Sequence, residues 1–267
     1  MDNRLGDYLR ARRGLVRPED VGLPPGGRRR VRGLRREELA LLAGISSDYY
    51  MRLEQGRDQH PSAQVLDAIA RVLRLDADAA AHLHGLARPD RRPALPARVP
   101  PSIMWLVDGW TDTPAYVHDG LTNVLAANAI ATALSPYYAP GRNLLKGVFL
   151  DPAQRALRPD WEQVTAKGVA GLRARAHGDD PDLDELAGEL AAGSERFRTL
   201  WNRHDVKGRS GQVNRFDHPR VGRLDLHADK LAIEGTDGLL LVLQHAEPGS
   251  ESAHALALLA EEVTPVR

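Results

Sequence analysis

Two short helical runs separated by one turn constrain the fold of this chain more than any other feature. Apolar residues recur at helical spacing across Arg35–Ala43, where Gly44 ends the run, and again across Ser46–Gln55. Ser46 is suited to cap the second helix, and the small side chain of Ala40 lets the two helices cross closely. The shared core is predicted to contain Leu39, Ala40, Ala43, Ile45, Tyr50 and Leu53.

Two helices joined by a short turn match the helix-turn-helix unit. The face of the second helix that the core leaves free carries Ser47, Asp48, Met51 and Arg52. Arginine pairs with O6 and N7 of guanine, and aspartate accepts from N4 of cytosine, so this face is suited to a DNA groove. A carboxylate beside DNA repels phosphate, so Glu54 is predicted to bond internally to an arginine of the first or second helix.

Charge is distributed unevenly along the chain. Residues 1–98 contain 19 Arg and 13 acidic residues, a net charge of +6, whereas residues 99–267 carry −6. Six arginines fall within nine positions: Arg28, Arg29, Arg30, Arg32, Arg35 and Arg36. We expect this cluster to contact the DNA backbone, which adds affinity and salt dependence with little specificity. A solvated loop is the alternative, and a helical protein-interaction module would not need these arginines.

Prolines divide the chain into two predicted domains. Residues 88–102 contain five prolines and little that forms a core, so residues 89–102 are predicted to be a linker. Residues 1–88 are predicted to form an all-α domain of five helices, with a loop over residues 14–33. Its other helices are expected at Arg4–Arg13, after Pro61-Ser62, and at Asp76–Ala87.

The pattern of residues 103–267 predicts both strands and helices. Strands are expected at Ala115–His118, Val124–Ala127, Gly211–Asp217, Val221–Ile233 (with a break) and Leu239–His245. Helices are expected at Asn128–Leu134, Asn143–Phe149, Asp160–Ala176, Asp182–Asn202 and Ser250–Glu261. The continuous apolar run Leu239–Leu243 is typical of a strand covered on both faces. Antiparallel strands with helices gathered on one side predict an α+β domain.

Several classes of protein are excluded by what the sequence lacks. The chain has no cysteine, which excludes disulfides, thiolate nucleophiles and metal sites with Cys ligands. No metalloprotease, serine-hydrolase, phosphate-loop or dinucleotide motif is present, so no enzyme activity, cofactor or metal is expected. No apolar run approaches the roughly 18 residues of a membrane span. We expect a cytoplasmic protein that associates with the nucleoid.

The N-terminal sequence resembles helix-turn-helix regulators of the xenobiotic-response-element or phage-repressor class. The resemblance rests on Glu38-Leu39-Ala40, Ala43-Gly44-Ile45-Ser46, Tyr50, Leu53-Glu54-Gln55-Gly56 and Pro61-Ser62. Residues 33–40, 48–50 and 52–57 are similar to the MmyB-like branch of that class. The resemblance implies that Ser47, Asp48 and Arg52 read bases and that Arg36, Gln55 and Arg57 contact the DNA backbone.

The C-terminal sequence extends this resemblance. It is similar to the ligand-binding domain of MmyB-like regulators at residues 114–119, 124–128, 149–152, 160–161, 200–206, 218–224 and 246–250. The resemblance implies a PAS-like domain, in which an antiparallel sheet and helices enclose a pocket for a fatty acid or another small amphipathic ligand. It further implies a transcription factor, most often a repressor. Since one recognition helix reads only a few base pairs, a homodimer on a palindromic operator is expected.

A pocket of this kind needs aromatic walls and a cationic end that pairs with an anionic head group. The candidate ligand-binding residues are Trp161, Trp201, Arg203, His204, Arg215 and His218. Core packing and ordinary surface charge are the alternative roles for them. A second function also stays open, in which DNA binding is constitutive and the C-terminal domain is a scaffold for protein interaction or dimerisation.

Overall fold

The computed structural model describes residues 3–24, 33–58, 60–87, 98–175, 180–203 and 212–263. The chain divides into two compact units. The first comprises Met1–Arg92, Arg173–Pro181 and Thr199–Gly208, and the second comprises Pro93–Leu172, Asp182–Arg198 and Arg209–Arg267. Two short segments from the C-terminal half therefore group with the N-terminal helices, which the sequence does not signal. Most of the predicted linker, residues 89–97, lies outside the described residues.

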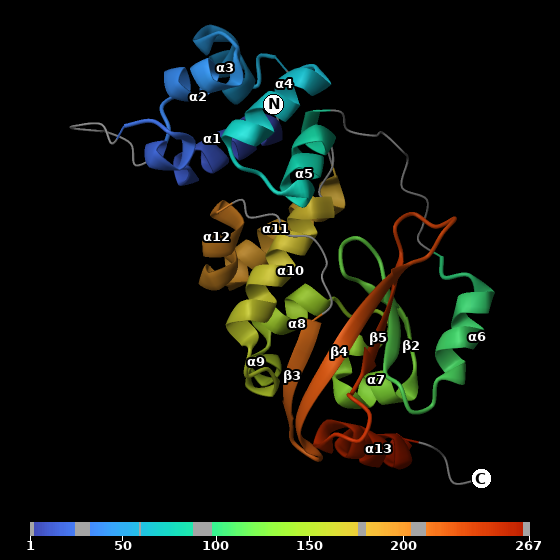
Figure 1. The fold of residues 1–267 in the computed structure, drawn as a ribbon. Coiled ribbons are helices and arrows are strands. Elements are labelled where there is room, and N and C mark those ends of the chain that lie inside the picture. Colours follow the sequence, from blue (N-terminus) through green and yellow to red (C-terminus); the bar gives the residue numbers. More distant parts are fainter. Residues whose placement is uncertain are drawn as a thin grey trace. The chain divides into compact units, whose positions relative to one another are not determined.

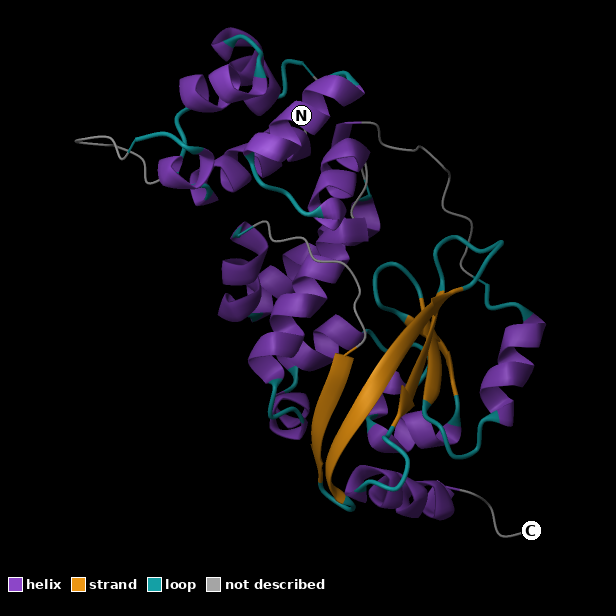
Figure 2. Cartoon of the chain, viewed as in Figure 1, coloured by secondary structure: helices purple, strands orange, loops and turns teal. Residues whose placement is uncertain are grey.

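Five α-helices form the described part of residues 3–87, as the sequence predicts (Figures 1 and 2). They are α1 (Arg4–Leu15), α2 (Arg36–Ala43), α3 (Ser47–Glu54), α4 (Ala63–Val72) and α5 (Ala77–Ala87). A 3-10 helix, η1 (Pro18–Val21), forms within the segment that was expected to be a loop. Leu9, Leu39, Leu53 and Leu66 are fully buried in one core, so α1 to α4 all contribute to it.

Gly44 makes the turn between α2 and α3 possible. Its φ of +69° lies in the left-handed region, which a side chain disfavours. In this conformation its N–H donates to the carbonyl oxygens of Ala40 and Leu41 and closes the end of α2. Two eight-residue helices are thereby joined with only three residues between them, which is the geometry that the sequence predicted.

The second unit contains one sheet of five antiparallel strands, in the order β2-β1-β5-β4-β3. The strands are β1 (Ala115–His118), β2 (Val124–Ala127), β3 (Gln212–His218), β4 (Gly222–Ala232) and β5 (Leu240–His245). All five occupy predicted positions, which confirms the α+β class. The expected break in β4 was wrong, because β4 pairs continuously, first with β3 and then with β5. The central strand β5 is buried at Leu240, Leu241 and Val242, as its apolar run predicts.

Eight α-helices lie in the described part of the chain after residue 98. They are α6 (Pro101–Gly109), α7 (Ala129–Leu134), α8 (Leu144–Leu150), α9 (Pro152–Leu157), α10 (Trp161–Arg175), α11 (Pro181–Gly193), α12 (Glu195–Asn202) and α13 (Glu251–Val263). The helical stretch Asp182–Asn202 is divided into α11 and α12 because Ser194 starts a new helix, accepting a hydrogen bond from the N–H of Phe197 at 3.2 Å. Helix α6 was not predicted, since its first residues fall within the proline-rich segment.

The two faces of the sheet pack against different helices, so the expectation that the helices gather on one side was wrong. Phe216 and Val242 lie on one face and share a core with residues of α7 and α13. Val117 and Leu241 lie on the opposite face and share a smaller core with Val107 of α6. Figure 1 shows α6 beside the edge strand β2 and α13 below the lower ends of the strands. None of the helices in the described ranges combines the length and the apolar character needed to cross a bilayer.

Close approach of α1 to the end of α3 leaves no room for a side chain at Gly6. A Cβ atom there would lie 2.3 Å from the backbone oxygen of Glu54. We predict that Gly6→Ala lowers the free energy of unfolding by about 1–3 kcal/mol, because the two helices must separate. The measurement is urea unfolding followed by circular dichroism.

Gly14→Ala in the same helix is the matched control. A Cβ at Gly14 meets nothing within 4 Å, so alanine should raise helix stability by roughly 0.5–1 kcal/mol. Equal effects of the two substitutions on the free energy of unfolding would show that a Cβ atom at position 6 does not force α1 and α3 apart.

Candidate DNA-binding surface

Helix α3 is held at its N-terminus by capping and along one side by burial. The hydroxyl of Ser46 accepts a hydrogen bond from the backbone N–H of Tyr49 at 3.1 Å, which confirms the predicted cap. Tyr50 and Leu53 are fully buried, whereas Ser47 and Asp48 are exposed. The helix therefore turns toward solvent the face on which the predicted base-reading residues lie.

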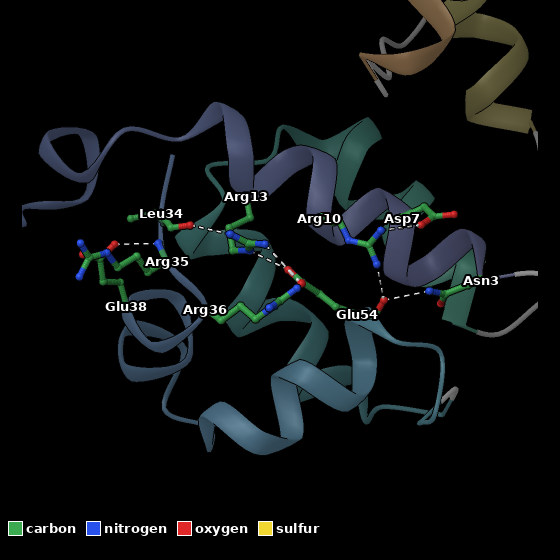
Figure 3. Close-up of polar contacts among 9 residues, drawn as sticks. All are labelled: Asn3, Asp7, Arg10, Arg13, Leu34, Arg35, Arg36, Glu38 and Glu54. Carbon is green, nitrogen blue, oxygen red and sulfur yellow. Dashed lines mark hydrogen bonds and ion pairs between the residues drawn. The ribbon is translucent and has the colours of Figure 1, made fainter. Parts of the chain in front are cut away.

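Glu54, the last residue of α3, occupies the centre of a buried ion network (Figure 3). Its side chain is completely buried. Oε1 accepts from Nε of Arg13 at 2.6 Å, and Oε2 accepts from Nε of Arg36 at 2.6 Å and from Nη2 of Arg13 at 3.3 Å. Arg13 belongs to α1 and Arg36 to α2, so one carboxylate joins three helices. The predicted internal bond of Glu54 is confirmed.

The backbone of Glu54 attaches α3 to α1 a second time. Its carbonyl oxygen accepts from Nδ2 of Asn3 at 2.8 Å and from Nη2 of Arg10 at 3.2 Å. Helix ends leave carbonyl groups without partners in their own helix, and here Arg10 of α1 and Asn3, which directly precedes α1, satisfy one of them. Arg13 extends the network further, because its Nη1 donates to the carbonyl oxygen of Leu34 at 2.7 Å, just before α2.

The charges of this network stabilise one another. Burial by itself raises the pKa of Glu54, but the hydrogen bonds and charges of Arg13 and Arg36 outweigh burial and lower that pKa below its ordinary value. Burial lowers the pKa of Arg13, and the bond to Glu54 more than reverses that effect. The carboxylate and the guanidinium are therefore both charged near neutral pH.

Arg13 was not among the predicted functional residues, although the sequence carries a signal for it. Leu5, Leu9 and Arg13 lie four residues apart, so they share one side of α1. Leu5 and Leu9 are buried, and Arg13 is only 9% exposed. An arginine that continues an apolar stripe requires a buried counter-charge, and Glu54 supplies it.

Two of the predicted base-reading residues form an ion pair on the exposed face. Nη1 of Arg52 lies 2.5 Å from Oδ2 of Asp48, one helical turn earlier. The Arg52 guanidinium also lies 5.6 Å from the centroid of the Tyr49 ring. The side chain of Arg52 is 43% exposed and that of Asp48 is 66% exposed, so the ion pair restrains Arg52 without withdrawing it from solvent.

The predicted contacts with the DNA backbone have different surroundings. Gln55 and Arg57 are exposed just after α3, and Arg35 is exposed at the start of α2. Arg36 is 42% exposed, but its Nε donates to Glu54, so its main role is to connect α2 to α3. Its phosphate contact stays a prediction that involves the other guanidinium nitrogens. Four predicted contacts lie outside the described residues: Arg28, Arg29, Arg30 and Arg32.

Both halves of the chain match known families. A helix-turn-helix domain model matches residues 4–83, and the model of the MmyB-like transcription regulator ligand binding domain matches residues 99–259. The chain belongs to the MmyB-like transcription regulators. The regulator thus combines a DNA-binding helix-turn-helix domain with a ligand-binding domain, and the resemblance seen in its motifs is confirmed. No curated protein matches the chain.

The predicted ligand-binding residues of the MmyB-like regulator are divided between the two units. Trp201 and Arg203 belong to the first unit, where the Arg173 guanidinium lies 4.0 Å from the centroid of the Trp201 ring. Trp161 belongs to the second unit, and its indole Nε1 donates to the carbonyl oxygen of Val148 at 2.7 Å. His204 lies outside the described residues.

Arg215 and His218 both lie on β3 but on opposite faces of the sheet. Arg215 is exposed and lies 3.9 Å from Asp225 on the neighbouring strand. His218 is buried, and its Nε2 lies 3.1 Å from the carbonyl oxygen of Ala133 in α7. The structure therefore does not bring these two side chains together. Within the described ranges, no group of three or more His, Asp and Glu is placed to hold a metal ion.

The ion network predicts a specific dependence of stability on pH. Glu54→Gln leaves Arg13 buried without its counter-charge, which should cost about 3–5 kcal/mol of unfolding free energy near neutral pH. The folded pKa of Glu54 lies below 4.5, its ordinary value, so the ionic stabilisation is fully present above pH 4.5 and is lost as the pH falls through the folded pKa. The difference between wild type and Glu54→Gln should therefore shrink in acid, as measured by urea unfolding across this range.

Glu37→Gln is the matched control, because Glu37 is exposed in the first turn of α2. Its effect should be within about 0.5 kcal/mol at every pH. A Glu54→Gln deficit that stays constant in acid would mean that the lost stability does not come from the ionised carboxylate.

Proposed function

We propose that this MmyB-like regulator represses transcription by placing α3 in the major groove of operator DNA. The proposal rests on the contrast between the two sides of α3, one buried and one exposed. Glu54 fixes the buried side of α3 to α1 and α2, while Ser47, Asp48 and Arg52 stay accessible. A helix anchored in this way lets Arg52 pair with guanine and Asp48 accept from cytosine. Repression is the outcome that the resemblance to phage repressors favours.

Contacts with the DNA backbone supply orientation and most of the salt-dependent affinity in this proposal. We assign them to Arg28, Arg29, Arg30, Arg32, Arg35, Arg36, Gln55 and Arg57. Because α3 has eight residues and reads only a few base pairs, we further propose a homodimer on a palindromic operator. Its half-sites would lie about 34 Å apart, one turn of the double helix.

The C-terminal domain would act as the sensor. We propose that it binds a small amphipathic molecule such as a fatty acid, which the match to a ligand-binding domain supports. The ligand changes the affinity for DNA if it binds one arrangement of the dimer more tightly than another. The resulting change in the free energy of DNA binding cannot exceed the difference in the free energy of ligand binding between the two arrangements.

One observation favours a second candidate function. Helix α6 exposes Trp105 to 73%, together with Met104 and Leu106 at 39% and 44%. Adjoining exposed apolar side chains are typical of protein interaction sites. In this alternative, DNA binding is constitutive and the C-terminal domain is a scaffold that contacts a protein partner.

Selection of bound fragments from random DNA should return a defined operator, and Arg52→Ala should change how it is read. We predict a loss of about 1–3 kcal/mol in binding free energy and relaxed preference at one base position, because one bidentate contact is removed. Fluorescence anisotropy at fixed salt concentration measures both effects.

Arg223→Ala is the control for loss of positive charge. Arg223 is 66% exposed on β4, and its removal should leave the operator preference unchanged. If purified protein binds no duplex at low salt, or if both variants lose affinity equally for all sequences, α3 is not the reading element.

Ligand binding separates the sensor from the scaffold. A sensor should show a saturable rise in melting temperature with fatty acids, since a ligand at 100 times its Kd stabilises the folded state by about 2.7 kcal/mol. Differential scanning fluorimetry of the full-length protein with fatty acids of increasing chain length tests this. A flat response to all amphiphiles, with DNA binding intact, would favour the scaffold.

A further inference from the structure

Four polar side chains lie together within the apolar core formed by the sheet, α7 and α13. The rings of Tyr116 on β1 and Tyr138 on η2 (Pro136–Tyr138) are stacked, with centroids 4.4 Å apart and planes at 13°. The hydroxyl of Tyr138 accepts from Nη2 of Arg158 at 2.7 Å. Gln244, on β5, interacts through its side chain with the Tyr116 hydroxyl and lowers the pKa of that group, although burial raises this pKa by more. Both tyrosines belong to the buried core cluster of this domain.

The hydrogen-bonding capacity of this cluster is incompletely used. Gln244 is 0% exposed, and neither Oε1 nor Nε2 of its amide makes a hydrogen bond of normal geometry. Nη1 of Arg158 is also buried without a hydrogen-bond partner. Buried polar groups in native proteins are nearly always satisfied, because an unmade bond costs free energy. An apolar residue would fill the place of Gln244 without this cost, so the cluster points to a missing partner.

The charge of Arg158 shows what kind of partner is missing. One face of its guanidinium lies 3.8 Å from the centroid of the Phe216 ring. In the described residues Arg158 makes no ion pair. Asp160, two residues later in the chain, accepts a hydrogen bond from the N–H of Arg215 with Oδ2 at 3.4 Å, and its Oδ1 is another buried atom without a hydrogen-bond partner. A partly buried guanidinium next to phenol and amide groups is complementary to an anionic oxygen pair, since charge-assisted bonds are strongest there.

We propose that Arg158, Tyr138, Tyr116 and Gln244 bind the carboxylate of a small, otherwise apolar molecule in the ligand-binding domain. Nη1 of Arg158 and Nε2 of Gln244 would each donate to one carboxylate oxygen. The apolar part of the ligand would contact the core residues around Phe216 and Val242. Burial raises the pKa of Tyr116 well above its ordinary value, so its hydroxyl stays protonated and can donate.

This site rests on the proposed sensing function, but it differs from the residues that the sequence suggested. None of Trp161, Trp201, Arg203, His204, Arg215 and His218 belongs to it. Arg158 directly follows α9, and Gln244 lies about 90 residues later on β5, so only the packing of the sheet brings them together.

The test compares decanoate with 1-decanol, which has the same chain without the charge, by calorimetric titration of the full-length protein. Arg158→Met keeps the aliphatic bulk and removes the guanidinium. We expect it to weaken decanoate binding by about 10- to 100-fold and to change decanol binding by less than about threefold. Arg155→Met is the matched control, because Arg155 is an exposed arginine on α9 that stacks on Trp161, and it should leave decanoate binding unchanged.

Gln244→Leu gives an independent readout that does not depend on the charge. It should raise the melting temperature of the ligand-free protein, since it removes two unsatisfied polar atoms, and it should weaken decanoate binding. A lower melting temperature would mean that Gln244 is a structural residue. Far-UV circular dichroism of each variant, compared with the wild type, reports that the ligand-binding domain is folded.

The outcomes distinguish the site from the proposed function. Equal binding of decanoate to wild type and Arg158→Met would overturn the carboxylate site and uphold ligand binding elsewhere in the domain. Equal binding of decanoate and decanol to wild type would overturn the choice of an anionic head group. Absence of binding by both compounds to wild type would overturn this site and the proposed sensing of amphipathic ligands together.

Discussion

The buried carboxylate of Glu54 is the interaction on which the DNA-binding surface depends. Helices α2 and α3 have eight residues each, which is too short for stable helix formation in isolation. Packing around Leu39, Tyr50 and Leu53 supplies the apolar part of their stability. Glu54 fixes the orientation, because its side chain and carbonyl oxygen connect α3 to α1 and α2. A buried charge is costly unless it is paired, and Arg13 and Arg36 pair it from two sides.

This arrangement explains why an acidic residue is tolerated in a protein that binds a polyanion. Glu54 is enclosed by two guanidinium groups and has no exposed surface, so it presents no bare negative charge to phosphate. The other carboxylate of α3, on Asp48, is exposed and paired with Arg52. One acid of the recognition helix thus organises the fold, while the other restrains the residue assigned to base reading.

The ligand-binding domain shows the opposite use of buried polar groups. The Glu54 network satisfies both of its carboxylate oxygens, whereas Gln244 and Arg158 retain unused hydrogen-bonding atoms among apolar side chains. A fully satisfied network rigidifies a fold, and a partly satisfied one lowers stability unless another molecule completes it. This contrast is why we assign structure to the first cluster and binding to the second.

The elements that depend on local pattern can be predicted from the residues alone. The helices around Gly44, the cap at Ser46, all five strands and the motifs of the family follow from spacing and residue type over short distances. Even the internal pairing of Glu54 was predictable, because a carboxylate near DNA needs a cation.

Contacts between residues far apart in the chain could not be predicted in this way, because they form only when the elements pack. Arg13 and Glu54 are 41 residues apart, and Tyr138 and Arg158 come together only when the sheet and its helices pack. Sequence patterns also placed Arg215 and His218 in one candidate site, yet strand alternation puts them on opposite faces of β3. Periodicity reports which side of an element faces the core, but the partner across the core depends on how the elements pack.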